Sequence, residues 1–146
     1  MSFGTEQINS PVKLYLVDDH LVLRQALAEA LEHRGKYAVV GHTGSSNELL
    51  IQSPNCKADV IVLDFSLPRT NGLEVLNELR RRGVDIPVLI MSGDESGRAA
   101  KAAIQAGAKG FVPKQAGLSE MEHAIDEIAR GGTYLSPSIV ASNNAG

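Results

Sequence analysis

The sequence predicts a doubly wound α/β fold. Runs of apolar residues, many of them β-branched, recur five times along the 146 residues, and each is followed by a segment in which apolar residues have helical spacing. Strands that alternate with helices form a parallel sheet with helices on both faces, joined mostly by right-handed crossovers. The run at residues 60–63 is entirely apolar, which is typical of a strand that is covered on both faces. We therefore expect five parallel strands and five helices.

Each predicted strand is an apolar run of strand length that ends at a polar or turn-forming residue. The strands are expected at residues 12–17, 37–41, 59–63 and 86–92, with a short fifth strand within 107–114. Two of them stop directly at acidic residues, the first at Asp18 and the third at Asp64. In open α/β sheets the binding crevice lies beyond the carboxyl ends of the strands, so these acids are placed for chemistry as well as for turning the chain.

Apolar residues recur at helical spacing after each strand. The helices are expected at residues 21–34, 46–53, 73–82, 95–106 and 118–131. Gly35 and Gly83 follow two of these segments, as glycine commonly does where a helix ends, and Pro54 closes the second helix. The helix at 95–106 has Ile104 as its only large aliphatic residue, so we expect it to be the least firmly packed element.

Composition and length indicate one ordinary globular domain, with 43% hydrophobic residues. We expect this domain to span residues 12–132, after a small, polar leader, and residues 133–146 to form a linker that leads towards an absent effector domain. The single cysteine, Cys56, excludes an intramolecular disulfide. A net charge of −3 gives no basic field for a nucleic-acid backbone, so we expect no direct nucleic-acid binding by this chain. No apolar run approaches the ~20 residues of a membrane span, so we expect no membrane contact and a cytoplasmic location.

Five polar residues follow predicted strands and are expected at one edge of the sheet: Asp18, Asp19, Asp64, Ser92 and Lys114. Carboxylates that lie close together repel each other unless a cation is shared between them, and hard oxygen ligands with room for water suit Mg²⁺. A lysine and a hydroxyl are the groups that the oxygens of an incoming phosphoryl group require. A carboxylate in such a site can act as the nucleophile and become an aspartyl-phosphate.

Four motifs together resemble the receiver domain of two-component response regulators, over about residues 12–132. They are Val-Asp-Asp-His at 17–20, Leu-Asp-Phe-Ser-Leu-Pro at 63–68 with Asn-Gly at 71–72, Met-Ser at 91–92, and Gly-Ala-Lys-Gly-Phe at 107–111 with Lys114. The start and the exit of the segment are most similar to the NarL/FixJ branch, in which the receiver precedes a LuxR-type helix-turn-helix domain. The resemblance implies a flavodoxin-like sheet with strand order 2-1-3-4-5.

The resemblance also implies roles for individual residues. Asp64 is expected to be the phosphoacceptor. Asp19, Asp64 and the backbone carbonyl of Ser66 are expected to ligate Mg²⁺ directly, and Asp18 through water. The implied phosphodonor is a sensor histidine kinase, and phosphorylation is expected to favour a homodimer and to control a DNA-binding transcriptional effector. The domain is not expected to be an enzyme, apart from a slow Mg²⁺-dependent autophosphatase activity.

Lys114 and Ser92 are the implied contacts of the phosphoryl group, and Phe111 is the aromatic residue whose rotamer follows Ser92. Two residues depart from the family pattern. Gln115 stands after the lysine, where many receivers have proline, and Gly93 follows Ser92, where alanine is frequent. Glycine gives the second loop additional backbone freedom.

Three other readings use the same residues. A phosphatase of the haloacid-dehalogenase type also forms an aspartyl-phosphate, but it places a second aspartate two residues later, where this chain has Ser66. A flavodoxin-type electron carrier requires a phosphate-binding loop after the first strand, and Asp18 and Asp19 would repel that phosphate. A stand-alone receiver that acts by protein–protein interaction is the third.

Overall fold

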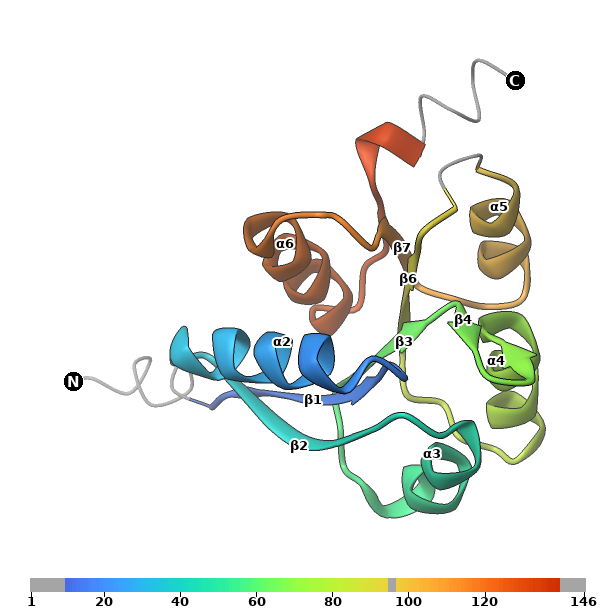
Figure 1. Cartoon of the computed structure of the whole chain (residues 1–146), viewed down its shortest axis with the longest axis horizontal. Coiled ribbons are helices and arrows are strands. Elements are labelled where there is room, and N and C mark those ends of the chain that lie inside the picture. Colours follow the sequence, from blue (N-terminus) through green and yellow to red (C-terminus); the bar gives the residue numbers. More distant parts are fainter. Residues whose placement is uncertain (1–9, 95–96, 140–146) are drawn as a thin grey trace.

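The computed structural model describes residues 10–94 and 97–139, which form a parallel sheet with helices on both faces (Figure 1). The strand order is β2-β1-β3-β6-β7-β8. The strands are β1 (Val12–Val17), β2 (Tyr37–Thr43), β3 (Val60–Asp64), β6 (Val88–Ser92), β7 (Gly110–Pro113) and β8 (Tyr134–Leu135). The first five of these, in chain order, confirm the predicted order 2-1-3-4-5, and β8 adds a sixth strand that was not predicted.

The five predicted helices are all present. They are α2 (Leu21–His33), α3 (Ser46–Gln52), α4 (Gly72–Arg81), α5 (Arg98–Gln105) and α6 (Leu118–Ala129), and a short 3₁₀ helix, η1 (Ser53–Asn55), follows α3. Figure 1 shows α2 and α6 on one face of the sheet and α3, α4 and α5 on the other. The predicted beginning of α5 at residues 95–96 lies outside the described residues.

The core has two layers because successive strand residues point to opposite faces of the sheet. In β1, Leu14 and Leu16 pack with α2 and α6, whereas Tyr15 and Val17 pack with α3, α4 and α5. All five residues of β3 are buried. This confirms that the apolar run at 60–63 is a central strand covered on both sides.

The helix α5 is anchored by small side chains. Ala100 and Ala103 are fully buried, while Ile104 is 40% exposed. The helix therefore buries little apolar area, which is the feature that led us to expect weak packing.

The segment after Thr133 corrects the prediction that the tail has no secondary structure. The strand β8 pairs in parallel with β7, and the hydroxyl of Tyr134 donates a hydrogen bond to Oε2 of Glu120 in α6 at 2.9 Å. Further on, residues 137–139 are helical and Ile139 is fully buried in the core. A two-residue strand has no readable period, and these long-range contacts leave no local sequence signal.

The loop after β3 also contains structure that was not predicted. A small antiparallel hairpin consists of β4 (Ser66–Leu67) and β5 (Thr70–Asn71). Arg69, at its turn, has a φ of 67°. The side chain of Asn71 accepts a hydrogen bond from the Glu74 N–H and caps α4, and the Gly72 N–H donates to the carbonyl of Phe65 at 2.6 Å. These contacts fix the chain immediately after Asp64.

Candidate functional site

The ends of four adjacent parallel strands bring the predicted polar residues together. Asp64 is the last residue of β3 and Ser92 the last of β6, while Asp18 follows β1 and Lys114 follows β7. The strands β1, β3, β6 and β7 are neighbours in the sheet, so their carboxyl ends form one edge. The Lys114 N–H donates to the carbonyl of Ser92 at 2.8 Å, which joins two of these ends directly.

Asp64 lies at the centre of this edge and is 1% exposed. Its Oδ1 accepts a hydrogen bond from the Ser66 N–H at 3.1 Å. Its Oδ2 lies 2.8 Å from Nζ of Lys114 in an ion pair. No other described residue donates a hydrogen bond to Oδ2. The carboxylate is therefore held on one side by the backbone and faces a cation on the other.

Burial raises the pKa of Asp64 above its usual range, and the nearby charge of Asp18 acts in the same direction. Contacts with Lys114 and with the Ser66 N–H oppose this rise without cancelling it. For Lys114, desolvation alone would lower the pKa, but the contact with Asp64 and the charges of Asp64 and Asp18 outweigh it and the pKa is raised. The lysine therefore remains a cation beside Asp64 at neutral pH.

Asp18 and Asp19 complete an acidic cluster in which His20 also takes part. Asp18 is 2% exposed, and its Oδ2 lies 3.6 Å from Nζ of Lys114. One ligand atom from each of Asp18, Asp19, His20 and Asp64 lies within 4.8 Å of the other three. Sequence analysis assigned no role to His20, although its position directly after the two acids was a signal that could have drawn attention to it.

Ser92 and Phe111 are both buried, at 1% and 0% exposed. The hydroxyl oxygen of Ser92 accepts a hydrogen bond from the Asp94 N–H at 3.0 Å. Phe111 belongs to the same core cluster as Ala100 and Ala103 of α5. The resemblance implies that the rotamer of Phe111 follows Ser92, and in this structure the ring lies inside the core.

A sequence model described as the response regulator receiver domain matches residues 14–126. The chain belongs to this receiver domain family. The match covers every strand from β3 to β7 and each of the strand ends described above.

Relatives and solved structures place the receiver in the predicted branch. It is 38% identical over 124 residues to the DNA-binding transcriptional activator DevR/DosR of Mycobacterium tuberculosis, and 33% identical over 135 residues to the transcriptional regulatory protein UhpA of Salmonella typhimurium. A crystal structure of a LuxR-family two-component response regulator from Aurantimonas sp. SI85-9A1 superposes with a TM-score of 0.87 at 29% identity, over 93% of this chain and 97% of that one.

The receiver spans only part of these curated relatives. The matches cover 85% of this chain but 57% of DevR/DosR, and 92% of this chain but 67% of UhpA. The activity of a whole response regulator therefore does not transfer to this chain directly. Among the described residues, no helix combines the length and hydrophobicity that crossing a membrane would require.

The donor atoms of the cluster fit the acidic pocket in which receiver domains bind Mg²⁺. The carboxylates of Asp18, Asp19 and Asp64 are the hard oxygen ligands that this ion prefers. The N–H of Ser66 donates a hydrogen bond to Asp64 and so fixes this residue beside the cluster. This contact does not show whether the Ser66 carbonyl binds the metal ion. The metal roles of individual residues thus remain predictions.

The pKa of Asp64 gives a prediction for stability. Because its folded pKa is raised, ionisation is less favourable in the folded than in the unfolded receiver, so stability is lost as the pH rises through the folded pKa. In Mg²⁺-free buffer at pH 7, Asp64→Asn should therefore have a higher free energy of unfolding than wild type. The gain should shrink as the pH falls through the folded pKa and should vanish below the ordinary aspartate pKa of about 3.9, where both states are protonated.

Urea unfolding at pH 7 and at two lower pH values measures this difference. The matched control is Asp85→Asn, since Asp85 is an exposed aspartate. A gain for Asp64→Asn that is absent at pH 7, or that does not decrease on acidification, would contradict the prediction.

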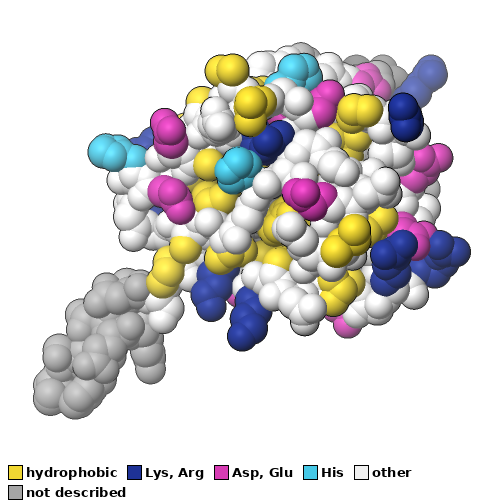
Figure 2. Space-filling view, turned by 60° about the horizontal axis from the view of Figure 1, so that its bottom comes forward, with side chains coloured by type: hydrophobic (Ala, Val, Ile, Leu, Met, Phe, Trp, Pro, Cys, Tyr) yellow, Lys and Arg dark blue, Asp and Glu magenta, His cyan; other side chains and the backbone are white. Residues whose placement is uncertain are grey.

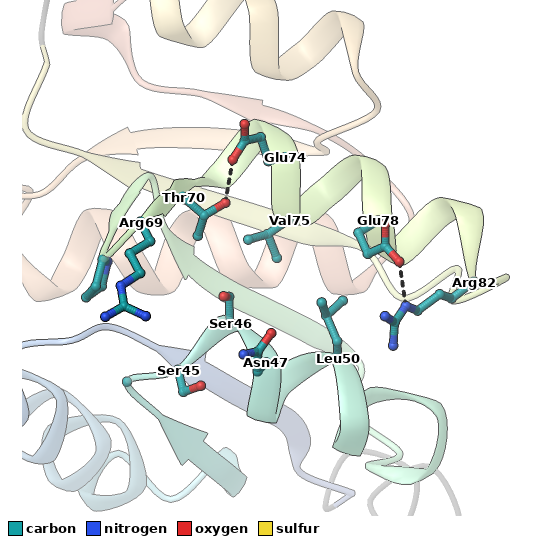
Figure 3. Close-up of a pocket in the computed structure, with 12 residues that line it drawn as sticks. Ser45, Ser46, Asn47, Leu50, Arg69, Thr70, Glu74, Val75, Glu78 and Arg82 are labelled. Carbon is teal, nitrogen blue, oxygen red and sulfur yellow. Dashed lines mark hydrogen bonds and ion pairs between the residues drawn. The ribbon is translucent and has the colours of Figure 1, made fainter.

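A groove of the receiver lies away from these groups. A groove of about 620 Å³ runs between α3 and α4, with the β4–β5 hairpin at one end, as Figure 3 shows. Two pairs of its polar side chains contact each other: the hydroxyl of Thr70 donates to Glu74 at 2.7 Å, and Arg82 contacts Glu78 at 2.7 Å. None of Asp64, Ser92 and Lys114 lines this groove.

Proposed function

We propose that this receiver domain accepts a phosphoryl group on Asp64 in a Mg²⁺-dependent reaction and that the phosphorylated state controls a transcriptional effector. The observation that carries the proposal is the 2.8 Å ion pair between Asp64 and Lys114 beside a cluster of two further carboxylates. A buried carboxylate whose role was only to end a strand would not require an ion pair with a lysine beside two further carboxylates. The names of the relatives, an activator and a transcriptional regulatory protein, support the effector.

In the proposed reaction, a carboxylate oxygen of Asp64 attacks the phosphorus atom of the phosphodonor. The P–O bond to Asp64 forms as the bond from phosphorus to the leaving group breaks, and the leaving group retains the electron pair. The ammonium group of Lys114 stabilises the charge on the phosphoryl oxygens, and the hydroxyl of Ser92 donates a hydrogen bond to one of them. When bound, Mg²⁺ neutralises charge on the same oxygens. The slow return of the phosphoryl group to water is the proposed autophosphatase activity.

Asp19 and Asp64 would hold the ion directly, with the Ser66 carbonyl, and Asp18 would do so through water. Asp19 is the ligand that can be altered without changing the phosphoacceptor. We expect Asp19→Asn to weaken Mg²⁺ binding by about tenfold or more, because one of the few charged ligands is lost.

Phosphorylation by acetyl phosphate at increasing Mg²⁺ concentrations tests this expectation. The variant should require more Mg²⁺ for the same yield, and EDTA should abolish the label in both proteins. Equal Mg²⁺ dependence of Asp19→Asn and wild type would show that Asp19 does not hold the ion.

The proposed phosphodonor is a phosphohistidine of a sensor histidine kinase, the class of protein with which receiver domains interact. Three consecutive aliphatic residues at the start of α2, directly after the acidic cluster, are available for this docking: Leu21 is 52%, Val22 79% and Leu23 46% exposed. A homodimer of phosphorylated receivers is part of the same proposal.

Direct recognition of DNA is not assigned to the described residues. Figure 2 shows one face on which Lys and Arg side chains stand in small separate groups with acidic side chains among them. Such a surface does not supply the continuous positive field on which DNA binding depends. We propose that the effector, and not the receiver, contacts DNA.

The proposed signal passes from Asp64 through Ser92 to Phe111. The Ser92 oxygen accepts from the Asp94 N–H, which leaves its O–H able to donate a charge-assisted hydrogen bond to the phosphoryl group; this bond should draw the hydroxyl towards Asp64, and the loop after β6, which is joined to it through Asp94, should move. Because Phe111 packs in the same cluster as α5, whose anchors are alanines, a shift of this loop should change the packing around the ring.

Ser92→Ala should remove most of this propagation. In NMR spectra recorded with and without beryllofluoride, wild type should show shift changes that reach α5 and β7, whereas Ser92→Ala should confine them to the neighbours of Asp64. Changes of equal extent in both proteins would exclude Ser92 as the link.

A further inference from the structure

His20 stands among the carboxylates of the acidic cluster, and the proposed function gives its side chain no role. Its backbone N–H donates to Oδ1 of Asp18 at 2.9 Å, and its ring Nδ1 lies 3.1 Å from the same oxygen. Nδ1 also lies 3.4 Å from Oδ1 of Asp19. The His20 side chain is 65% exposed, so these polar contacts, rather than packing, hold the ring in place.

The four donor atoms of the cluster are almost as close as the ligands of one ion. Atoms from Asp18, Asp19, His20 and Asp64 lie within 4.8 Å of one another. Two ligands at about 2.0–2.2 Å from a shared ion lie at most ~4.4 Å apart. An exposed imidazole can cover the remaining few tenths of an ångström by a small rotation, since little packing opposes it.

The surroundings of Nδ1 include acceptors on one side and a cation on the other. Nζ of Lys114 lies 3.3 Å from Nδ1. A lysine can only donate and a carboxylate can only accept, whereas Nδ1 carries either one proton or one lone pair. In the tautomer that accepts from Lys114, the lone pair of Nδ1 faces the same ammonium group as Oδ2 of Asp64 at 2.8 Å and Oδ2 of Asp18 at 3.6 Å, so these three groups surround a position that favours a cation.

A second observation points to a ligand at the same place. Oδ2 of Asp64 is buried and accepts no hydrogen bond from the described residues. Buried carboxylate oxygens normally have hydrogen-bond partners or coordinate cations. The ammonium of Lys114 at 2.8 Å balances its charge but leaves its lone pairs incompletely used.

We propose that His20 is a nitrogen ligand of this site, so that the site binds first-row transition-metal ions such as Co²⁺ and Zn²⁺ in competition with Mg²⁺. Imidazole suits these ions, whereas Mg²⁺ prefers oxygen ligands and retains several waters. The proposal rests on the proposed function for the identity of the site as a divalent-cation site. It adds a residue that determines which ion is preferred.

The test is a calorimetric titration of Co²⁺, and separately of Mg²⁺, into the metal-free full chain without an affinity tag. Truncation of the exposed His20 side chain should not unfold the receiver. We expect His20→Ala to weaken Co²⁺ binding by about tenfold or more, and to change the Mg²⁺ dissociation constant by less than about twofold. The paramagnetic Co²⁺ should also shift the ring signals of His20 in NMR spectra of wild type.

The matched control is His33→Ala, since His33 is an exposed histidine at the opposite end of α2, about 18 Å along the helix from Leu21. It should leave both affinities unchanged. Equal Co²⁺ affinity of His20→Ala and wild type, with Mg²⁺ binding intact, would show that His20 is not a ligand but would leave the proposed function in place. If wild type binds neither Co²⁺ nor Mg²⁺, both the role of His20 and the acidic metal site of the proposed function are wrong.

Discussion

Ile139→Ala should lower the free energy of unfolding by about 2 kcal/mol or more, although residue 139 lies beyond the predicted boundary of the domain. Ile139 is fully buried in the cluster that also contains Phe111. Shortening a buried aliphatic side chain loses its transfer free energy and leaves a cavity that the neighbours fill only in part. Urea unfolding followed by circular dichroism measures the change.

Ile51→Ala is the matched control because it makes the same substitution at an isoleucine that is 74% exposed. Its effect should be within about 0.5 kcal/mol. If the two variants were equally stable, the segment after Thr133 would not pack on the receiver in solution, and the first interpretation of it as a linker would stand.

The sheet was predictable because its signal is local. The apolar runs at β1, β3 and β6 are long enough to identify each strand, and the helices between them impose parallel pairing. Strand order followed from the resemblance, and the structure confirms it. The grouping of these residues was predictable for the same reason, since Asp64 and Ser92 end recognisable strands and Lys114 follows one, and parallel strands place their ends at one edge.

The features that were missed depend on contacts between distant parts of the chain. The strand β8 is defined by its pairing with β7 and by the hydrogen bond from Tyr134 to Glu120. The hairpin turn at Arg69 requires a positive φ at a residue that does not signal it. His20 has its place through Asp18 and Lys114, and Lys114 lies 94 residues away in the sequence.

The buried position of Phe111 bears on the proposed switch. From the state seen here, in which the ring is fully buried, an inward turn from solvent is not available, so we expect the packing around the ring to rearrange. The alanines of α5 keep the free-energy cost of such a rearrangement low, because few large side chains have to repack. The extent of beryllofluoride-induced shifts in wild type and Ser92→Ala is therefore the measurement that bears on this part of the account.

The central claim is that Asp64 is the phosphoacceptor. Wild type, Asp64→Asn and the exposed control Asp85→Asn are incubated with acetyl phosphate and Mg²⁺, and their intact masses are recorded after confirming by circular dichroism that each is folded. Wild type and Asp85→Asn should gain the mass of one phosphoryl group, and EDTA should prevent the gain. Asp64→Asn should gain none, because the amide is not a nucleophile that can replace the carboxylate. Label on Asp64→Asn at the level of wild type would contradict the assignment.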